Sequence, residues 1–327
     1  MKAFAYINPT NEKDAVAALS TQIEQAMPIG GGQDLLARMK DYVTQPDRIV
    51  NVKVALESTV TPLNGGLRIG AAMRMVDVAE HAQIAKLYPA FSAAAIEVGT
   101  PQIRNQATVG GNINQRPRCW YYRNEEFVCF KKGGNQCFSP AGENQFHAIL
   151  GGGPSYIVHP SSLAVPSVSY GATFRLAGPK GERMVAAADY FTLPRQSLRM
   201  ENVLAPDELL THVILPAPGA VKSGHYEVRY KESHDWPIAF ATVLLTMNGA
   251  NVRSARVVMG AVAPIPWRSP AAEQALAGKA ITEETAAAAA DAALKDARPL
   301  SQNAYKVDVA KVAVKRAILR AAGIKVA

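Results

Sequence analysis

Cysteine is scarce in this chain of 327 residues: there are three, and all of them lie between residues 119 and 137. Three cysteines cannot pair completely within one chain, and their confinement to one short segment is unlike a disulfide framework spread across a domain. We therefore interpret Cys119, Cys129 and Cys137 as reduced thiols or metal ligands.

Long apolar runs and blocks of like charge are absent as well. No run approaches the roughly 18 apolar residues needed to cross a bilayer, and residues 1–6 lack the apolar core of a secretory signal. We expect no membrane insertion and a cytoplasmic location, with the periplasm open to a complex exported on a partner's signal. The net charge is +8, but the basic residues are scattered, so we predict no nucleic-acid binding.

The length predicts two or three compact units, and Pro216 and Pro218 indicate a domain boundary. Hydrophobic periodicity predicts mixed α and β structure in the first hundred residues. The expected elements are a helix through Val16, Leu19, Ile23 and Ala26, a helix from Asp34 through Met39, strands over residues 48–52 and 67–71, and a helix over residues 90–98 that Pro101 stops.

The rest of the chain predicts an antiparallel sheet with helices. The expected elements are a helix over residues 161–170, a hairpin over 172–185, strands over 238–247 and 252–262 joined at Asn248 and Gly249, a helix from the N-cap Thr282 to Lys295, and a helix over 308–322. In the last helix one face carries Ala310, Ala313, Val314, Ala317 and Ala321.

Two glycine-rich loops are candidate anion sites. The first glycine loop (residues 30–32) leads into the helix expected at Asp34, where exposed amides and the helix dipole favour a pyrophosphate. The second glycine loop (residues 108–112) reads Thr-Val-Gly-Gly-Asn. Each loop alone is equally compatible with an ordinary turn, and the first lacks the Rossmann spacing. Together they favour a dinucleotide.

Five motifs occur in a characteristic order. They are Gly-Gly-Gly-Gln-Asp-Leu-Leu at 30–36, Leu-Arg-Ile-Gly-Ala at 67–71, Ile-Arg-Asn-Gln-Ala-Thr-Val-Gly-Gly-Asn at 103–112, His-Pro-Ser-Ser at 159–162 and Met-Gly-Ala-Val-Ala-Pro at 259–264. In this order they resemble the FAD-binding medium subunit of the xanthine dehydrogenase family of molybdenum hydroxylases.

The resemblance implies an α+β fold. Residues 1–216 would form a two-lobed FAD-binding domain of the vanillyl-alcohol oxidase/p-cresol methylhydroxylase type, with lobes at about 1–56 and 57–216 and a cysteine-bearing insertion at about 117–154. Residues 217–327 would form a smaller C-terminal α+β domain of the CO dehydrogenase flavoprotein type.

The resemblance also implies a set of cofactor-binding residues around FAD. These are Ile29, Gly30, Gly31, Gly32, Gln33, Asp34, Leu35, Thr108, Gly110, Gly111, Asn112, Ser162 and Lys231. The family more often has Ala and Thr at positions 30 and 33, and Asp at position 162, where Ser162 removes a charge. Lys231 would face the flavin and stabilise its reduced form, although a solvated strand end explains it as well.

The cysteine segment (residues 117–154) resembles an insertion found in subunits of periplasmic aldehyde oxidoreductases and of 4-hydroxybenzoyl-CoA reductase, where four cysteines hold a [4Fe-4S] cluster. The three cysteines match three of those positions, and the fourth falls on Ser155. Three alternatives follow: a four-iron cluster with Ser155 or another oxygen or nitrogen ligand, a [3Fe-4S] cluster, or no cluster. His147 is the nearest alternative ligand, although an ordinary loop histidine is the simpler interpretation. Zinc is the second metal to consider, against which the wide cysteine spacing argues.

The resemblance predicts an electron-transfer subunit of a heteromeric molybdenum hydroxylase. A large molybdopterin subunit would oxidise an aldehyde or aromatic compound, and a small [2Fe-2S] subunit would pass electrons to FAD in this chain and on to an external acceptor. No Ser-His-Asp set or carboxylate pair suggests catalytic residues here. The alternatives are a stand-alone flavin oxidase and a metal-stapled structural adaptor, and the cysteine segment is itself a candidate docking surface.

Overall fold

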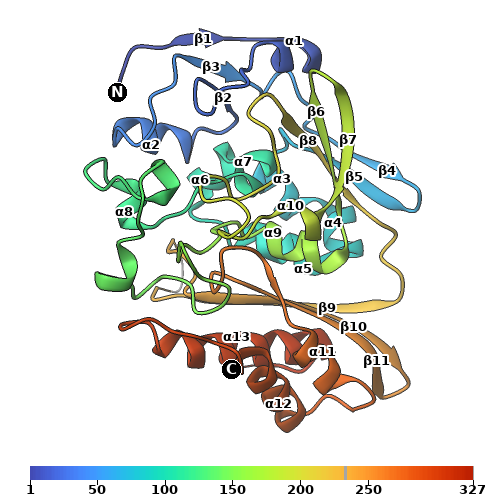
Figure 1. Cartoon of the computed structure of the whole chain (residues 1–327). Helices are drawn as coiled ribbons and strands as arrows, with labels where there is room; N and C mark the ends of the chain where they lie inside the picture. The colour runs from blue at the N-terminus through green and yellow to red at the C-terminus, as the bar shows by residue number, and fades with distance from the viewer. Residues whose placement is uncertain (232–233, 327) are drawn as a thin grey trace.

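The computed structural model describes residues 1–231 and 234–326, which form three sheets flanked by helices (Figure 1). The first sheet is parallel, with strand order β1-β3-β2. Its elements are β1 (Ala5–Ile7), α1 (Glu12–Ala17), β2 (Ala26–Ile29), α2 (Leu35–Lys40) and β3 (Arg48–Asn51). The first glycine loop therefore connects strand β2 to helix α2.

The second sheet is antiparallel and has the order β4-β5-β8-β6-β7. Its strands are β4 (Val60–Leu63), β5 (Gly66–Gly70), β6 (Thr173–Gly178), β7 (Gly181–Ala186) and β8 (Leu209–Leu215). The accompanying helices are α3 (Met75–Glu80), α4 (Ala82–Leu87), α5 (Pro89–Ile96), α6 (Pro101–Gln106), α7 (Val109–Ile113), α9 (Ala164–Tyr170) and α10 (Ala187–Tyr190). The buried rings of Phe174 and Tyr190 meet edge to face in this core.

The cysteine segment has little regular structure. It contains helix α8 (Trp120–Arg123) and the short 3₁₀ turns η1 (Phe130–Lys132) and η2 (Ser139–Ala141). Aromatic side chains supply much of its packing, because the rings of Tyr121, Phe127 and Phe138 contact one another.

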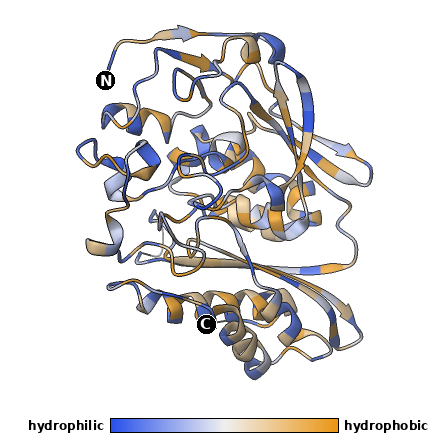
Figure 2. Ribbon diagram, viewed as in Figure 1, coloured by the Kyte–Doolittle hydropathy of each residue, from blue (hydrophilic) through white to orange (hydrophobic). Residues whose placement is uncertain are grey.

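The third sheet is antiparallel, has the order β12-β11-β10-β9, and is covered on one face by helices (Figure 1). Its elements are β9 (Val221–Val228), β10 (Ala239–Asn248), β11 (Asn251–Gly260), β12 (Trp267–Arg268), α11 (Pro270–Leu276), α12 (Glu283–Leu294) and α13 (Tyr305–Ala322). A Cβ atom on Gly224 of β9 would lie 2.2 Å from the Ala317 carbonyl oxygen, so glycine permits the close approach of α13. These helices alternate hydrophobic and hydrophilic residues, as expected where one face is buried (Figure 2).

Most local predictions agree with these elements. The α+β class, the hairpin of β6 and β7 and the antiparallel pair of β10 and β11 are confirmed. Thr282 caps helix α12, since its hydroxyl accepts a hydrogen bond from the Thr285 backbone N–H. The alanine face of α13 is buried as predicted, and this helix begins one turn earlier, at Tyr305.

Two predictions near the N-terminal half are wrong. Helix α1 ends at Ala17, and Ala26 begins a strand instead of ending a helix, because residues 26–29 pair with β3 and complete the parallel sheet. Ile23 is 39% exposed, so it forms no part of a buried helix face. Pro101 does not stop the preceding helix, because α5 ends at Ile96; it occupies the first turn of α6 instead, where its missing N–H costs nothing.

Within the described residues, none of the helices combines the length and the apolar character that a membrane crossing requires.

Candidate cofactor site

A cavity of about 380 Å³ lies where the two glycine loops meet residues 200–210. Residues 234–237, at the entry to the third sheet, complete its wall. This volume falls within the range of about 300–1,000 Å³ that is usual for small-molecule and cofactor sites. The cavity thus lies between all three parts of the fold.

The glycines allow the two loops to touch. A Cβ atom on Gly31 would lie 2.1 Å from the backbone oxygen of Gln106, and one on Gly30 would lie 2.5 Å from the Thr108 hydroxyl. Gly32 has a φ of +73°, which side chains disfavour. The first glycine loop is therefore held directly against the backbone that leads into the second.

The second glycine loop is fixed by its own polar side chains. The Thr108 hydroxyl accepts a hydrogen bond from the Gly111 N–H at 3.2 Å. The Asn112 side-chain oxygen accepts bonds from the Ser161 hydroxyl at 2.8 Å and from the Leu163 N–H at 3.1 Å. Asn112 thus anchors the His-Pro-Ser-Ser segment and brings Ser162 to the cavity wall.

The predicted cofactor residues lie together with one exception. Lys231 is exposed and is not among the described residues that line the cavity. The lining contains all the others, namely Ile29, Gly30, Gly31, Gly32, Gln33, Asp34, Leu35, Thr108, Gly110, Gly111, Asn112 and Ser162.

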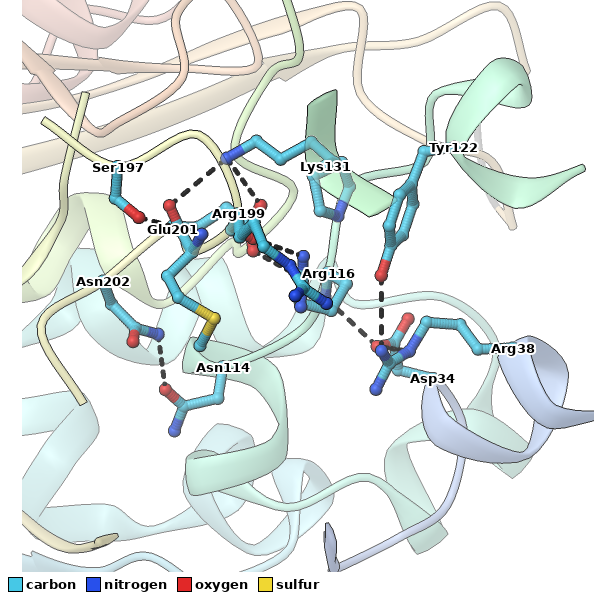
Figure 3. Close-up of polar contacts among 12 residues, drawn as sticks. Asp34, Arg38, Asn114, Arg116, Tyr122, Lys131, Ser197, Arg199, Glu201 and Asn202 are labelled. Carbon is cyan, nitrogen blue, oxygen red and sulfur yellow. Dashed lines mark hydrogen bonds and ion pairs between the residues drawn. The ribbon is translucent and has the colours of Figure 1, made fainter. Parts of the chain in front are cut away.

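The segment of residues 200–210 and the arginines Arg38, Arg116 and Arg118 also line the cavity, although no pattern in the sequence marked them as site residues. Glu201 lines the cavity, is 3% exposed, and pairs with Arg116 at 2.6 Å and with Lys131 at 3.0 Å (Figure 3). These partners are far away in the sequence, so no local pattern indicates the pairing.

Asp34 is a second ionic centre beside the cavity (Figure 3). Its carboxylate lies 2.5 Å from Arg123 and 2.8 Å from Arg118, and it accepts the Arg116 backbone N–H at 3.1 Å. Burial opposes ionisation, but Arg123, Arg38 and Arg118 together lower the pKa of Asp34 below its usual value. The Arg118 guanidinium also lies 4.3 Å from the centre of the Trp236 ring.

The three cysteines and Ser155 line a second, much smaller cavity of about 10 Å³. Four aromatic side chains, Lys131 and Ile157 complete its wall. Burial raises the pKa of Cys119 to about 12, so this thiol is protonated at neutral pH without a metal. In the described part of the chain, no group of three or more His, Cys, Asp or Glu side chains is placed to hold a metal ion.

His147 is not an ordinary surface histidine. It is 3% exposed, and its Nε2 atom lies 3.2 Å from the Cys119 sulfur. Its carbonyl oxygen accepts hydrogen bonds from Lys306 at 3.1 Å and from Asn303 at 3.1 Å. Burial lowers the pKa of His147 to about 4, which keeps the ring neutral at pH 7. Lys306 of helix α13 and Asn303 just before it therefore fix the backbone of His147, whose ring lies beside Cys119.

The chain matches known proteins along nearly its whole length. Residues 2–218 match the family model "FAD binding domain in molybdopterin dehydrogenase", and residues 224–321 match "CO dehydrogenase flavoprotein C-terminal domain". The chain is 33% identical to the aldehyde oxidoreductase FAD-binding subunit PaoB of Escherichia coli (strain K12), over 95% of this chain and 96% of that one. It is 28% identical to the carbon monoxide dehydrogenase medium chain of Hydrogenophaga pseudoflava, over 96% of each.

Solved structures share the fold. A chain of carbon monoxide dehydrogenase from Hydrogenophaga pseudoflava superposes with a TM-score of 0.77 at 27% identity, covering 98% of each chain. A chain of quinoline 2-oxidoreductase from Pseudomonas putida 86 superposes with a TM-score of 0.78 at 24% identity, again over 98% of each.

Proposed function

Because the chain belongs to the FAD-binding medium subunits of the xanthine dehydrogenase family, we propose that it carries electrons through FAD within a heteromeric molybdenum hydroxylase. The observation that carries this proposal is the cavity formed where the two glycine loops meet. FAD, when bound, accepts electrons from one redox partner and passes them to another.

The residues of the large cavity fit a flavin dinucleotide. Gly30 and Gly31 bring backbone amides to the cavity without intervening side chains, and such amides suit a pyrophosphate, whereas the Gly111 N–H is already bonded to the Thr108 hydroxyl. Of the acidic side chains that line the cavity, Glu24, Asp34, Glu97, Glu201 and Glu208 pair with arginine or lysine, which reduces their repulsion of an anion. We propose that residues 29–35 and 108–112 hold the pyrophosphate, with Ser162 beside the flavin part of the cavity.

We propose the domain division at residues 216 and 217, with a large molybdopterin subunit and a small [2Fe-2S] subunit as partners. The similarity to an aldehyde oxidoreductase subunit favours an aldehyde as the substrate of the complex, with an aromatic compound as the alternative. Three cysteines are too few to hold both a [2Fe-2S] cluster and a cluster of this chain's own. An external acceptor would take electrons from the flavin.

We also propose an iron–sulfur cluster in the cysteine segment, of the [4Fe-4S] or the [3Fe-4S] type. The support is the chemistry of the donors, because three thiols and the Ser155 hydroxyl line one cavity. The side chains would have to move apart to admit a cluster, since the cavity now has room for about one water molecule.

Iron and acid-labile sulfide analysis of anaerobically purified protein tests the cluster. We expect both elements in the wild type and their loss in Cys129→Ser, with FAD retained in each. Iron absent from the anaerobic wild-type protein would contradict the cluster and leave the flavin proposal intact. Zinc in place of iron would favour a structural metal site that holds the cysteine segment together.

Flavin reduction tests the electron-transfer role against the alternatives. In an anaerobic complex with its partners, the aldehyde substrate should bleach the flavin absorbance, whereas the isolated chain with the same aldehyde should stay oxidised. Bleaching of the isolated chain would favour a stand-alone flavin oxidase. A chain that binds no FAD would favour the structural adaptor.

A further inference from the structure

Two ionic centres hold the cysteine segment against the wall of the large cavity. In both centres the wall supplies the acid, Asp34 or Glu201, and residues 116–131 supply the bases. Charge pairs that are largely removed from solvent thus fix the segment within this chain. Loss of one partner would leave the other charge buried and uncompensated, which destabilises the contact.

Asp34 contacts Arg118 and Arg123 of the cysteine segment and the backbone of Arg116 directly before it, and it also pairs with Arg38 of its own helix at 3.4 Å. It lies at the start of helix α2, directly after the first glycine loop, and its side chain is 16% exposed. One carboxylate oxygen accepts a hydrogen bond from Arg123 and forms an ion pair with Arg118 at 2.8 Å, and the other accepts the Arg116 backbone N–H. A carboxylate offers about four acceptor positions, so these three contacts use most of its capacity.

Glu201 connects the two cavities from the other side. Its side chain lines the large cavity and pairs with Lys131, which lines the small cavity beside Cys129. The Lys131 ammonium also donates to the Met200 backbone oxygen at 3.2 Å. The Glu201–Lys131 ion pair (Figure 3) therefore connects a residue that lines the large cavity with one that lines the small cavity.

We propose that Asp34 is a positioning residue that couples the two cavities, an inference that rests on the proposed flavin site. A dinucleotide in the large cavity fixes the first glycine loop and with it the Asp34 carboxylate. The fixed carboxylate holds Arg116, Arg118 and Arg123, and these hold the chain that carries Cys119 and Cys129. By thermodynamic reciprocity, order around the thiols must strengthen FAD binding by the same factor.

The coupling is measured as protection of the thiols by FAD. Flavin-free and iron-free full-length chain is mixed with a small aromatic disulfide, and the rate of thiol modification is recorded with and without saturating FAD. Couplings between protein sites commonly amount to about 5- to 150-fold, so we expect FAD to slow modification of the wild type by about tenfold or more. In Asp34→Asn, at saturating FAD, the protection should fall to less than about twofold, because a neutral amide cannot hold both guanidinium groups.

Asp77→Asn is the matched control. Asp77 forms a two-pronged pair with Arg74 at 2.7 Å on helix α3, and both side chains are well exposed. This variant also removes one carboxylate that pairs with arginine, so it should keep the full protection by FAD.

The possible outcomes distinguish a failure of the proposed coupling from a failure of the proposed flavin site. A wild-type chain that binds no FAD would remove the proposed flavin site itself. FAD binding without thiol protection in the wild type, or full protection in Asp34→Asn, would overturn the coupling. If Asp34→Asn does not fold, Arg123→Met removes one of the guanidinium partners of Asp34, together with the Arg123 hydrogen bonds to the Pro117 and Arg116 backbone oxygens. It should reduce the protection partially, and unchanged protection would again overturn the coupling.

Discussion

Replacement of Gly31 by alanine tests the contact between the two glycine loops. The added Cβ would lie 2.1 Å from the Gln106 carbonyl oxygen, 2.6 Å from its carbon and 2.8 Å from the Ala107 Cα. All three atoms belong to the backbone, so no side-chain rotation relieves the overlap and the loops must separate. Overpacking of this kind costs about 1–3 kcal/mol.

The separated loops must close again when FAD binds, so the cost appears as lost affinity. At about 1.4 kcal/mol per tenfold change, we expect the dissociation constant for FAD to rise about 5- to 150-fold in Gly31→Ala. The assay is a titration of the flavin-free full-length chain with FAD, followed by the change in flavin fluorescence.

Gly278→Ala serves as the control for the general cost of a new methyl group. Gly278 has a φ of +76° and, among the described residues, has no heavy atom within 4 Å of the added Cβ. The substitution strains the backbone by about 1–2 kcal/mol but lies outside the cavity lining, so FAD affinity should not change. Wild-type affinity in Gly31→Ala, or an equal loss in Gly278→Ala, would refute the reasoning.

Three further predictions concern stability. Burial lowers the pKa of His159 from 6.5 to about 4. Between these pH values the unfolded chain binds a proton that the folded chain does not, so the free energy of unfolding falls as the pH drops from about 6.5 to about 4. In urea unfolding, His159→Phe should flatten this pH dependence, and an unchanged slope would contradict the prediction. Gly224→Ala places a Cβ 2.2 Å from the Ala317 carbonyl oxygen and should lower the free energy of unfolding by about 1–3 kcal/mol, which a wild-type Tm would exclude. Thr282→Ala removes the cap of helix α12 and should cost about 1 kcal/mol by denaturant titration, with Thr282→Ser as the conservative control that stays close to wild type.

Short sequence patterns predicted the elements whose conformation depends on residues close together in the chain. The glycine loops, the hairpin of β6 and β7 and the cap at Thr282 depend on residues close together in the sequence, and the structure has them where the sequence placed them. The helix expected through Ile23 and Ala26 was wrong for the opposite reason. Apolar spacing fits a helix there, but pairing with the distant strand β3 decides in favour of a strand.

The wall of the large cavity likewise contains contacts between distant residues that no local sequence pattern indicates. Its glycine loops were predicted because glycine and threonine at this spacing indicate a turn that can approach an anion, whereas Ile29, Leu35 and Ser162 were predicted only from the family resemblance. Glu201 and its partners Arg116 and Lys131 were missed, since an isolated acidic residue in a sequence looks like surface. Its burial becomes visible only when the fold brings these three residues together.

The most direct test of the central claim is the visible absorption spectrum of the anaerobically purified protein, co-expressed with its partners, with the flavin extracted from this chain and counted. The account predicts two resolved flavin bands and one FAD per chain. A colourless chain, or one whose partners carry all the flavin, would contradict it.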